Sequence, residues 1–234
     1  MILWLVLFFI VIAISFVLAW QSMRDYREMP LKSKEEYALF LIRSTENLTA
    51  KTLSDIREHI VKDGLIISFE RLFKGKRAAL TIFGPKWVLK KFTDSLALLE
   101  LEDYSLKLND TDVHLWEMGS KSKDLKEQIS PEIFKNLPSL GEEEQFLWQV
   151  VLGAKGDKLP VFQSQIRAAV YAKDSARRRD LVQLFQNIST GELIKVPKPF
   201  SHEQMMSFYR LRSLGKDSEG LLLYPEKILK LIKF

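Results

Sequence analysis

The chain has 234 residues with a formal net charge of +5, and it contains no cysteine. The absence of thiols excludes disulfide bridges and thiolate-ligated metal sites, and it fits a reducing cytoplasm. The mildly basic balance permits contact with anionic lipid or nucleic acid without requiring either, and the length allows one large domain or two small ones.

The N-terminal apolar run is the most distinctive segment of the sequence. Residues 1–20 carry no charged side chain, and Ser15 is their one hydroxyl. A helix of that length rises about 30 Å, which matches the hydrocarbon core of a bilayer. A secretory signal peptide would begin with basic residues and have a shorter apolar stretch, although residues 17–19 also read as a weak cleavage site. We predict a membrane anchor, with signal cleavage as the alternative.

The anchor is predicted at residues 1–22, and a juxtamembrane linker at residues 23–35. Positive charges follow the apolar run from Arg24 onward, whereas only the amino terminus precedes it. Because positive charge favours the cytoplasmic side, the C-terminal body is expected in the cytoplasm. The predicted location is therefore the cell membrane, crossed once.

Residues 36–108 show the element order β-α-β-β-α-β of a split β-α-β unit. Apolar runs predict strands at residues 37–43, 65–73, 77–83 and 98–104. Asn47 or Thr49 is expected to cap a helix that ends at Gly64. Pro85 stands at the expected first position of a second helix, whose apolar positions are Val88, Phe92, Leu96 and Leu99.

Residues 109–198 repeat this order less regularly. Strands are predicted at residues 113–118, 144–152, 165–172 and 192–196. The first helix of this unit, at residues 121–136, is interrupted at Pro131. Asp174 is expected to cap the second helix, which carries Leu181, Phe185 and Ile188.

The expected fold class is α+β: an N-terminal transmembrane helix, two ferredoxin-like (βαββαβ) sandwich units and a short helical C-terminal extension at residues 199–234. In this extension, Ser201 and Gln204 have capping-box spacing at the start of a helix. The tail from Tyr224 mixes Ile and Leu with Lys, which predicts either an amphipathic helix or a final strand. For so short a segment, packing on the domain's own sheet is expected over a membrane surface or a partner groove.

Motifs for catalysis and cofactor binding are missing from the sequence. It contains no P-loop, no G-x-G-x-x-G, no G-x-S-x-G and no H-E-x-x-H, and its three histidines are far apart. Its acidic pairs are interpreted as solvated edges, since carboxylates are mostly exposed. We therefore expect no enzyme activity, no catalytic or metal-binding residues and no cofactor.

The order β-α-β-β-α-β is also the scaffold of RNA-recognition motifs, which stack bases on aromatic side chains of the third strand. In the corresponding stretch, residues 76–83, Ala78 and Leu80 occupy the two stacking positions. The sequence therefore argues against this mode of RNA binding.

Basic side chains cluster around the predicted hairpin, on the helix after it and in an arginine triplet. Such clusters are common on solvated faces, but they also suit nucleic-acid phosphates or anionic head groups. The residues of this candidate anionic-ligand or partner patch are Lys74, Lys76, Arg77, Lys86, Lys90, Lys91, Arg177, Arg178 and Arg179.

Four short motifs carry a resemblance to a known family: residues 37–43, the Ile-Ser-Phe-Glu strand of residues 65–70, the Gly-Pro-Lys turn of residues 84–86, and residues 99–104. Together they resemble the membrane-anchored N-terminal region that precedes conjugation-type (type IV secretion) ATPases in candidate-phylum bacteria. The resemblance covers about residues 36–190, and its later part is similar to the second α+β unit of that region.

The resemblance implies a scaffold rather than an enzyme. Because the chain reaches Phe234 without a P-loop, the family's ATPase domain is expected to be absent. The expected function is a non-enzymatic membrane-anchored scaffold or adaptor of a macromolecular transfer machine, in contact with lipid through residues 1–20 and with a secretion-type ATPase or channel subunit. The alternative is a membrane-tethered nucleic-acid-binding module that uses the basic clusters.

Overall fold

The computed structural model describes residues 8–16, 36–120, 134, 137–154, 160–187, 193–196, 200–215 and 220–233. Of the N-terminal apolar run, residues 8–16 are helical, and their large apolar side chains are exposed. No helix within the described ranges is long and apolar enough to cross a membrane. The linker predicted at residues 23–35 lies outside these ranges.

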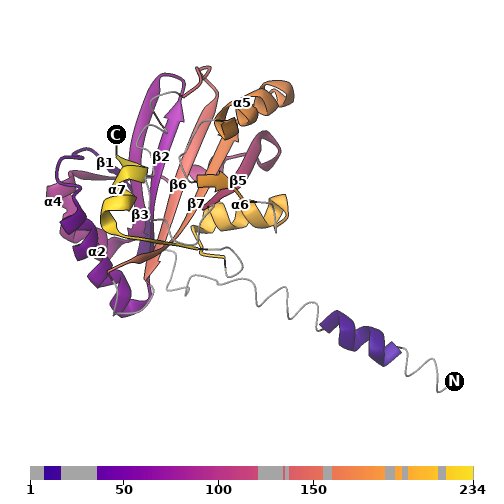
Figure 1. The fold of residues 1–234 in the computed structure, drawn as a ribbon, viewed down its shortest axis with the longest axis horizontal. Helices are drawn as coiled ribbons and strands as arrows, with labels where there is room; N and C mark the ends of the chain where they lie inside the picture. The colour runs from indigo at the N-terminus through magenta and orange to yellow at the C-terminus, as the bar shows by residue number, and fades with distance from the viewer. Residues whose placement is uncertain are drawn as a thin grey trace.

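The body of the protein is built on one nine-stranded antiparallel sheet with helices packed on it (Figure 1), which confirms the α+β class. The strands are β1 (Tyr37–Ile42), β2 (Ile66–Lys74), β3 (Arg77–Pro85), β4 (Leu98–Leu101), β5 (Val113–Ser120), β6 (Gln145–Ala154), β7 (Phe162–Tyr171), β8 (Leu193–Lys195) and β9 (Leu221–Leu223). Strands β1 to β8 lie where the sequence patterns predict strands, whereas β9 is not among the predicted strands.

The strand order divides the sheet into two half-sheets. The first half-sheet is β4-β1-β3-β2 and the second is β6-β7-β5-β8, with β9 paired to β7. β2 and β6 join them along an antiparallel pairing that runs from Ile66↔Gly153 to Lys74↔Gln145. The sequence patterns predict the two units separately, and this junction makes them one continuous sheet.

The helices connect the strands and form the C-terminal extension. They are α2 (Ala50–Asp63), α3 (Lys86–Leu89), α4 (Thr93–Leu96), α5 (Ser175–Asn187), α6 (His202–Leu211) and α7 (Pro225–Ile232), with 3₁₀ turns η2 (Lys90–Phe92), η3 (Tyr104–Lys107) and η4 (Asp110–Asp112). The helix predicted at residues 121–136 lies outside the described residues, apart from Phe134.

The start and end of α2 follow the predicted signals. Thr49, rather than Asn47, is the N-cap: its hydroxyl accepts a hydrogen bond from the Thr52 amide, and the Thr52 hydroxyl accepts one from the Thr49 amide. Gly64 ends the helix with a φ of 62°, in the left-handed region that glycine adopts at low cost.

The helix predicted from Pro85 is broken into short pieces, and two details of the prediction are wrong. Pro85 is the last residue of β3 and caps α3, so it does not occupy the first helical position. Leu99 lies in β4, not in the helix. The last piece, α4, ends at Ala97, which has a φ of 47°, and the Ser95 hydroxyl inside it donates to the Phe92 carbonyl at 3.2 Å.

Predicted features of the second half and the extension are largely confirmed. The Asp174 carboxylate accepts hydrogen bonds from the Ala176 and Arg177 amides at the start of α5. Ser201 and Gln204 form the predicted capping box of α6. Of the two alternatives for the tail, the helix is correct: α7 begins at Pro225 and packs on the protein's own sheet beside α2.

The two faces of the sheet carry different elements. The face that we call the helix-rich face is covered by α2, α3, α4, α5 and α7, whose apolar side chains form the main core with the sheet. The opposite face, which we call the α6 face, carries a smaller core in which Met206 and Phe208 of α6 pack with Leu115, Leu147 and Ala169. The two half-sheets therefore share a core on each side.

Candidate functional site

A row of polar side chains crosses five neighbouring strands on the α6 face. Direct cross-strand pairs link Thr81 to Glu70, Glu70 to Gln149, Gln149 to Arg167, and Arg167 to Glu117. We call these five residues the polar row. All are buried, although charged residues are rarely buried without partners. Its centre, Glu70 opposite Gln149, lies on the junction between the half-sheets.

Glu70 receives hydrogen bonds from three side chains. Its Oε1 accepts from Ser68 Oγ at 2.8 Å, from Gln149 Nε2 at 3.1 Å and from Arg212 Nε at 2.8 Å. A second Arg212 nitrogen lies 3.4 Å from its Oε2. A buried carboxylate is stabilised by such a set of donors and by a paired cation, so Glu70 is fully committed to neighbouring protein groups.

Arg212 is the cation that pairs with the buried Glu70 carboxylate. It follows α6 directly as the C-cap residue, with a φ of 50°. Its guanidinium donates to Asp103 Oδ2 at 2.5 Å and lies 4.2 Å from the centre of the Phe83 ring. The residue thus links the C-terminal extension to the first half-sheet.

Arg212 and Asp103 each stabilise the ionised form of the other. Burial lowers the pKa of Arg212, but the charge of Glu70 and the hydrogen bonds to Asp103 outweigh it, so the pKa lies well above its ordinary value. Burial likewise opposes ionisation of Asp103, yet the hydrogen bonds and charge of Arg212 hold the Asp103 pKa below its ordinary value. Both groups are therefore ionised at neutral pH.

Arg167, on β7 of the second half-sheet, binds the same C-terminal extension. Its guanidinium donates to the carbonyls of Phe208 at 2.9 Å and Ser213 at 2.5 Å, and to the side-chain oxygen of Gln149 at 3.2 Å. Burial lowers its pKa to about 10, with the charge of Glu117 opposing, so it remains a cation at neutral pH. It thus binds one carbonyl in the last turn of α6 and one just beyond the end of the helix.

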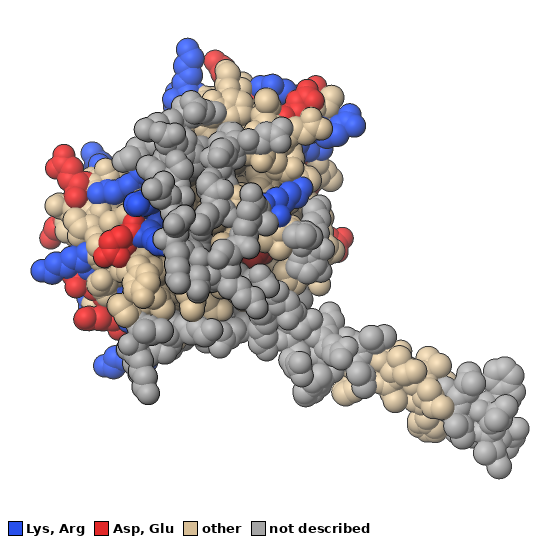
Figure 2. Space-filling model, in the orientation of Figure 1, with Lys and Arg blue, Asp and Glu red and all other residues tan. Residues whose placement is uncertain are grey.

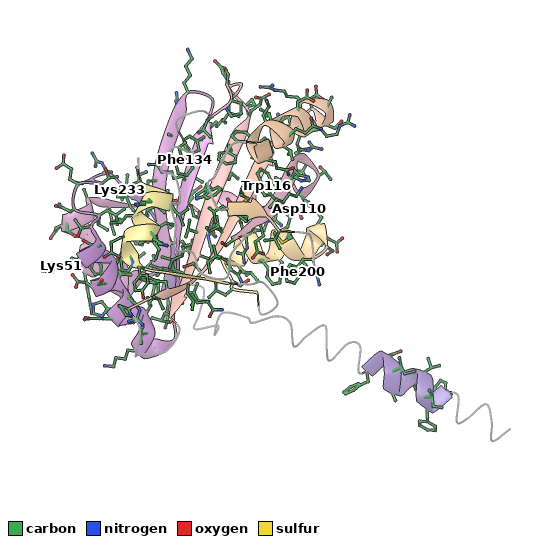
Figure 3. All side chains as sticks on the ribbon, in the orientation of Figure 1. Lys51, Asp110, Trp116, Phe134, Phe200 and Lys233 are labelled. Atoms are coloured by element: carbon green, nitrogen blue, oxygen red, sulfur yellow. The ribbon has the colours of Figure 1, made fainter. Side chains whose placement is uncertain are left out.

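Further contacts join residues 200–215 to the segments around the polar row. The hydroxyls of Tyr104 and Tyr209 lie 2.6 Å apart, and burial raises the pKa of both well above the ordinary tyrosine value. Phe200, which precedes α6, packs edge-to-face on Phe208, and Arg210 in the last turn of α6 binds Asp110. Phe200 and Asp110 are labelled in Figure 3. The site therefore binds a segment of its own chain, residues 200–215, and joins it to both half-sheets.

The predicted basic patch is divided between two ends of the sheet. Lys74, Lys76 and Arg77 lie at the β2–β3 turn, and Arg177 reaches the same end because it binds Glu144, whose carbonyl accepts from the Gly75 amide. Arg177, the first residue of the arginine triplet, is thus brought close to the hairpin, whereas Arg178 donates to the Ala172 carbonyl. Lys86, Lys90 and Lys91 follow the opposite end of β3, about 25–30 Å away along the strand.

Acidic partners compensate several of these cations. Lys74 lies 3.6 Å from Glu143, Arg177 lies 2.8 Å from Glu144, and Lys86 lies 2.5 Å from Glu100. Figure 2 shows Lys and Arg interspersed with Asp and Glu over the face in view. The predicted patch is therefore not one continuous basic surface among the described residues.

Sequence reasoning missed the polar row, although a signal is present. Glu70, Gln149, Arg167 and Glu117 each interrupt an apolar strand, and each falls on a position that alternation assigns to one face. One such residue reads as an irregularity of a strand. The four together, once the strand order is known, fall on a single line across the sheet.

Comparison with known proteins does not identify a family for this chain. Neither a family model nor a curated protein sequence matches this chain. Within the described part of the chain, no three acidic or histidine side chains converge as a metal site would require. The proposals below therefore depend on the residues and their geometry.

Proposed function

We propose that this chain is a membrane-anchored, non-enzymatic scaffold or adaptor. Residues 1–22 would form its single transmembrane helix, and residues 36–198 two ferredoxin-like units in the cytoplasm. Strand orders β4-β1-β3-β2 and β6-β7-β5-β8 support the assignment of both units, because each places the first and third strands of its unit in the middle.

The observation that carries the proposal is the commitment of the buried charges to the fold. Glu70 and Arg212 bind each other, and Arg167 binds backbone carbonyls of residues 208 and 213. Catalytic groups need donors or acceptors directed at a substrate. Here these groups fix a rigid two-unit body, which is what a scaffold needs in order to present surfaces in a constant arrangement.

The apolar N-terminus supports the membrane anchor. In the helix of residues 8–16, the side chains of Phe8, Phe9 and Phe16 are each more than half exposed. Exposed aromatic and aliphatic side chains in such a cluster are stabilised by an apolar environment, and the uncharged sequence of residues 1–20 is long enough for a bilayer to supply it.

The resemblance to regions that precede secretion ATPases suggests the partner. We propose that the body recruits a secretion-type ATPase or a channel subunit of a macromolecular transfer machine. A protein that supplies the anchor in trans needs no nucleotide site of its own, which fits a chain without a P-loop.

One observation favours the alternative of a membrane-tethered nucleic-acid binder: the hairpin cations and Arg177 meet at one end of the sheet. Against it, α6 covers the part of the sheet face that RNA-recognition motifs leave open for bases. Acidic partners also neutralise Lys74 and Arg177. The scaffold is therefore the better supported function.

The test is a native pull-down of the full chain from membranes in mild detergent, followed by cross-linking and mass spectrometry. The scaffold proposal expects an ATPase or channel subunit cross-linked to residues of the body. Recovery of nucleic acid without a protein partner would contradict it. In that case binding should weaken steeply with salt and should fade in the variant K74S/K76S/R77S.

A further inference from the structure

One corner of the body combines an exposed tryptophan with two exposed lysines. Trp87 of α3 is 41% exposed, and Lys90 and Lys91 in the following 3₁₀ turn are exposed. Lys91 Nζ lies 5.3 Å from the centre of the Trp87 ring, and the His59 ring of α2 packs edge-to-face on the same tryptophan. We call Trp87, Lys90 and Lys91 the α3 corner.

The two lysines of the α3 corner have cationic groups that other molecules can reach. Among the described residues, no carboxylate forms an ion pair with Lys90 or Lys91, although Asp94 follows them within about one helical turn. Lys86, by contrast, binds Glu100 and is left out of the corner. Stacking on an aromatic ring leaves the N–H donors of a lysine available to an anion.

The α3 corner lies at the end of the sheet where the chain enters the body. β1 begins at Tyr37, which pairs with Pro85, two residues before Trp87. Residues 23–35 connect this point to the predicted anchor, and even a fully extended chain of that length spans only about 45 Å. The hairpin of residues 74–77 is at the far end of β3. The connection therefore places the α3 corner, rather than the hairpin, next to the point of attachment.

We propose that the α3 corner docks on the anionic surface of the bilayer that holds the anchor. An indole ring prefers the boundary between head groups and hydrocarbon, and lysine binds the phosphates of the head groups. Each lysine near an anionic leaflet strengthens such a contact by about fivefold. The proposal rests on the membrane anchor proposed above. It adds a second contact, which fixes the orientation of the body relative to the bilayer.

The rest of this end of the sheet is less suited to an anionic surface. Leu222 and Tyr224 are also exposed here, since Leu222 pairs with Gln163, which is in register with the start of β2 through β6. Glu226, two residues after Tyr224, is an exposed acid, and an anionic leaflet repels carboxylates. The contact is therefore assigned to the α3 corner alone.

A single labelled thiol in the full chain tests the contact, because the natural sequence has no cysteine. Ser95→Cys carries a fluorophore on an exposed position one turn after Lys91, and Ala78→Cys carries it on an exposed position near the hairpin. The vesicles contain phosphatidylcholine, phosphatidylglycerol and a lipid with a spin-labelled head group, which quenches only nearby fluorophores. The label at residue 95 should be quenched at least about threefold more strongly than the label at residue 78, because docking holds it at the lipid surface.

Matched double variants identify the residues that make the contact. K90S/K91S should lower the ratio of docked to undocked corner about 25-fold, at fivefold per lysine, and should bring the quenching at residue 95 down to the level at residue 78. K74S/K76S removes two lysines from the hairpin and should leave the quenching at residue 95 unchanged. Equal quenching of the two labels, or undiminished quenching in K90S/K91S, would overturn the proposal.

Two further arms separate the lipid from nucleic acid and the contact from the anchor. If a DNA oligonucleotide changes the fluorescence of the label at residue 95 and the lipid does not, the corner binds nucleic acid and the lipid contact is wrong. If the chain stays with the vesicles through an alkaline wash without quenching of this label, the contact is wrong and the anchor stands. If the wash removes the chain, the proposed anchor is wrong, and the tethered contact is overturned with it.

Discussion

The two faces of the β2–β6 junction differ in their side chains, which are aromatic on one face and polar on the other. On the helix-rich face, aromatic rings meet across it: Phe73 lies 5.9 Å from Phe146, and Phe146 stacks on Phe185 at 3.9 Å. On the α6 face, the polar row crosses it at Glu70 and Gln149. Rings supply buried apolar area, whereas the polar row supplies directional bonds that only one arrangement satisfies.

The difference shows how the register of the junction is specified. Side chains alternate between faces, so a slip of one residue would turn Glu70 toward the aromatic cluster and Phe69 toward Arg212. An apolar pair alone tolerates such a slip poorly, and a buried carboxylate among rings does not tolerate it at all. Substitutions on the two faces should therefore differ in their effect on stability.

Removing the central cation should strongly destabilise the packing on the α6 face. Arg212→Ala leaves Glu70 and Asp103 without their countercharge and should destabilise the body by about 3–5 kcal/mol in urea unfolding. The exposed Arg179→Ala on α5 is the control and should change stability by less than about 0.5 kcal/mol. An Arg212→Ala protein as stable as the control would show that the ion pairs contribute little.

Two adjacent residues of β6 compare the faces directly. Gln149→Leu removes one donor from Glu70 and one from the Tyr209 carbonyl, together with an acceptor of Arg167, and should cost about 2–3 kcal/mol. Trp148 points to the other face, where no described residue accepts from its Nε1, so Trp148→Phe should cost only about 1 kcal/mol. Equal losses in urea titrations would contradict the proposed difference between the faces.

Acid should weaken the α6 face through Asp103. Its folded pKa is lower than its unfolded value near 3.8, so the stability it contributes is fully present above that value and is lost as the pH falls through the folded pKa. Asp103→Asn should remove about 1 kcal/mol at pH 7 and should flatten the decline of stability below pH 4. Asp110→Asn, at the partly buried pair with Arg210, should keep the natural decline.

The ion pairs at the hairpin end should matter least. Lys74 and Glu143 are both well exposed, so Lys74→Ala should change the unfolding free energy by less than about 0.5 kcal/mol, and less again in high salt. A loss above 1 kcal/mol would indicate that the hairpin contact supports the junction.

Local signals predicted most of the fold, because they act within a few residues. The capping boxes at Thr49 and Ser201 and the apolar runs of β1 and β6 fix elements wherever the chain later packs. The helix after β3 was overextended because Leu99 matches a helical spacing by chance. Periodicity cannot distinguish such a position from one in an edge strand.

The candidate site was missed for a different reason. Its bonds join positions that are distant in sequence, such as Glu70 with Arg212 and Tyr104 with Tyr209. No periodic pattern links residues so far apart, and their pairing follows only from the strand order. The basic residues were visible in the sequence, but their acidic partners Glu143 and Glu144 became evident only from the fold.

The separation between Glu70 and its cation has a consequence during translation. Arg212 lies 142 residues after Glu70, so at ordinary synthesis rates it is made roughly 7 to 28 s later. In the early part of that interval, after β4 is made and before β6 is made, the first half-sheet has an unpaired edge at β2. The adjacent charges Glu70 and Arg71 then stand on an uncovered strand, where they discourage aggregation with other nascent chains. The same carboxylate thus protects an edge early in synthesis and secures the finished protein at the end.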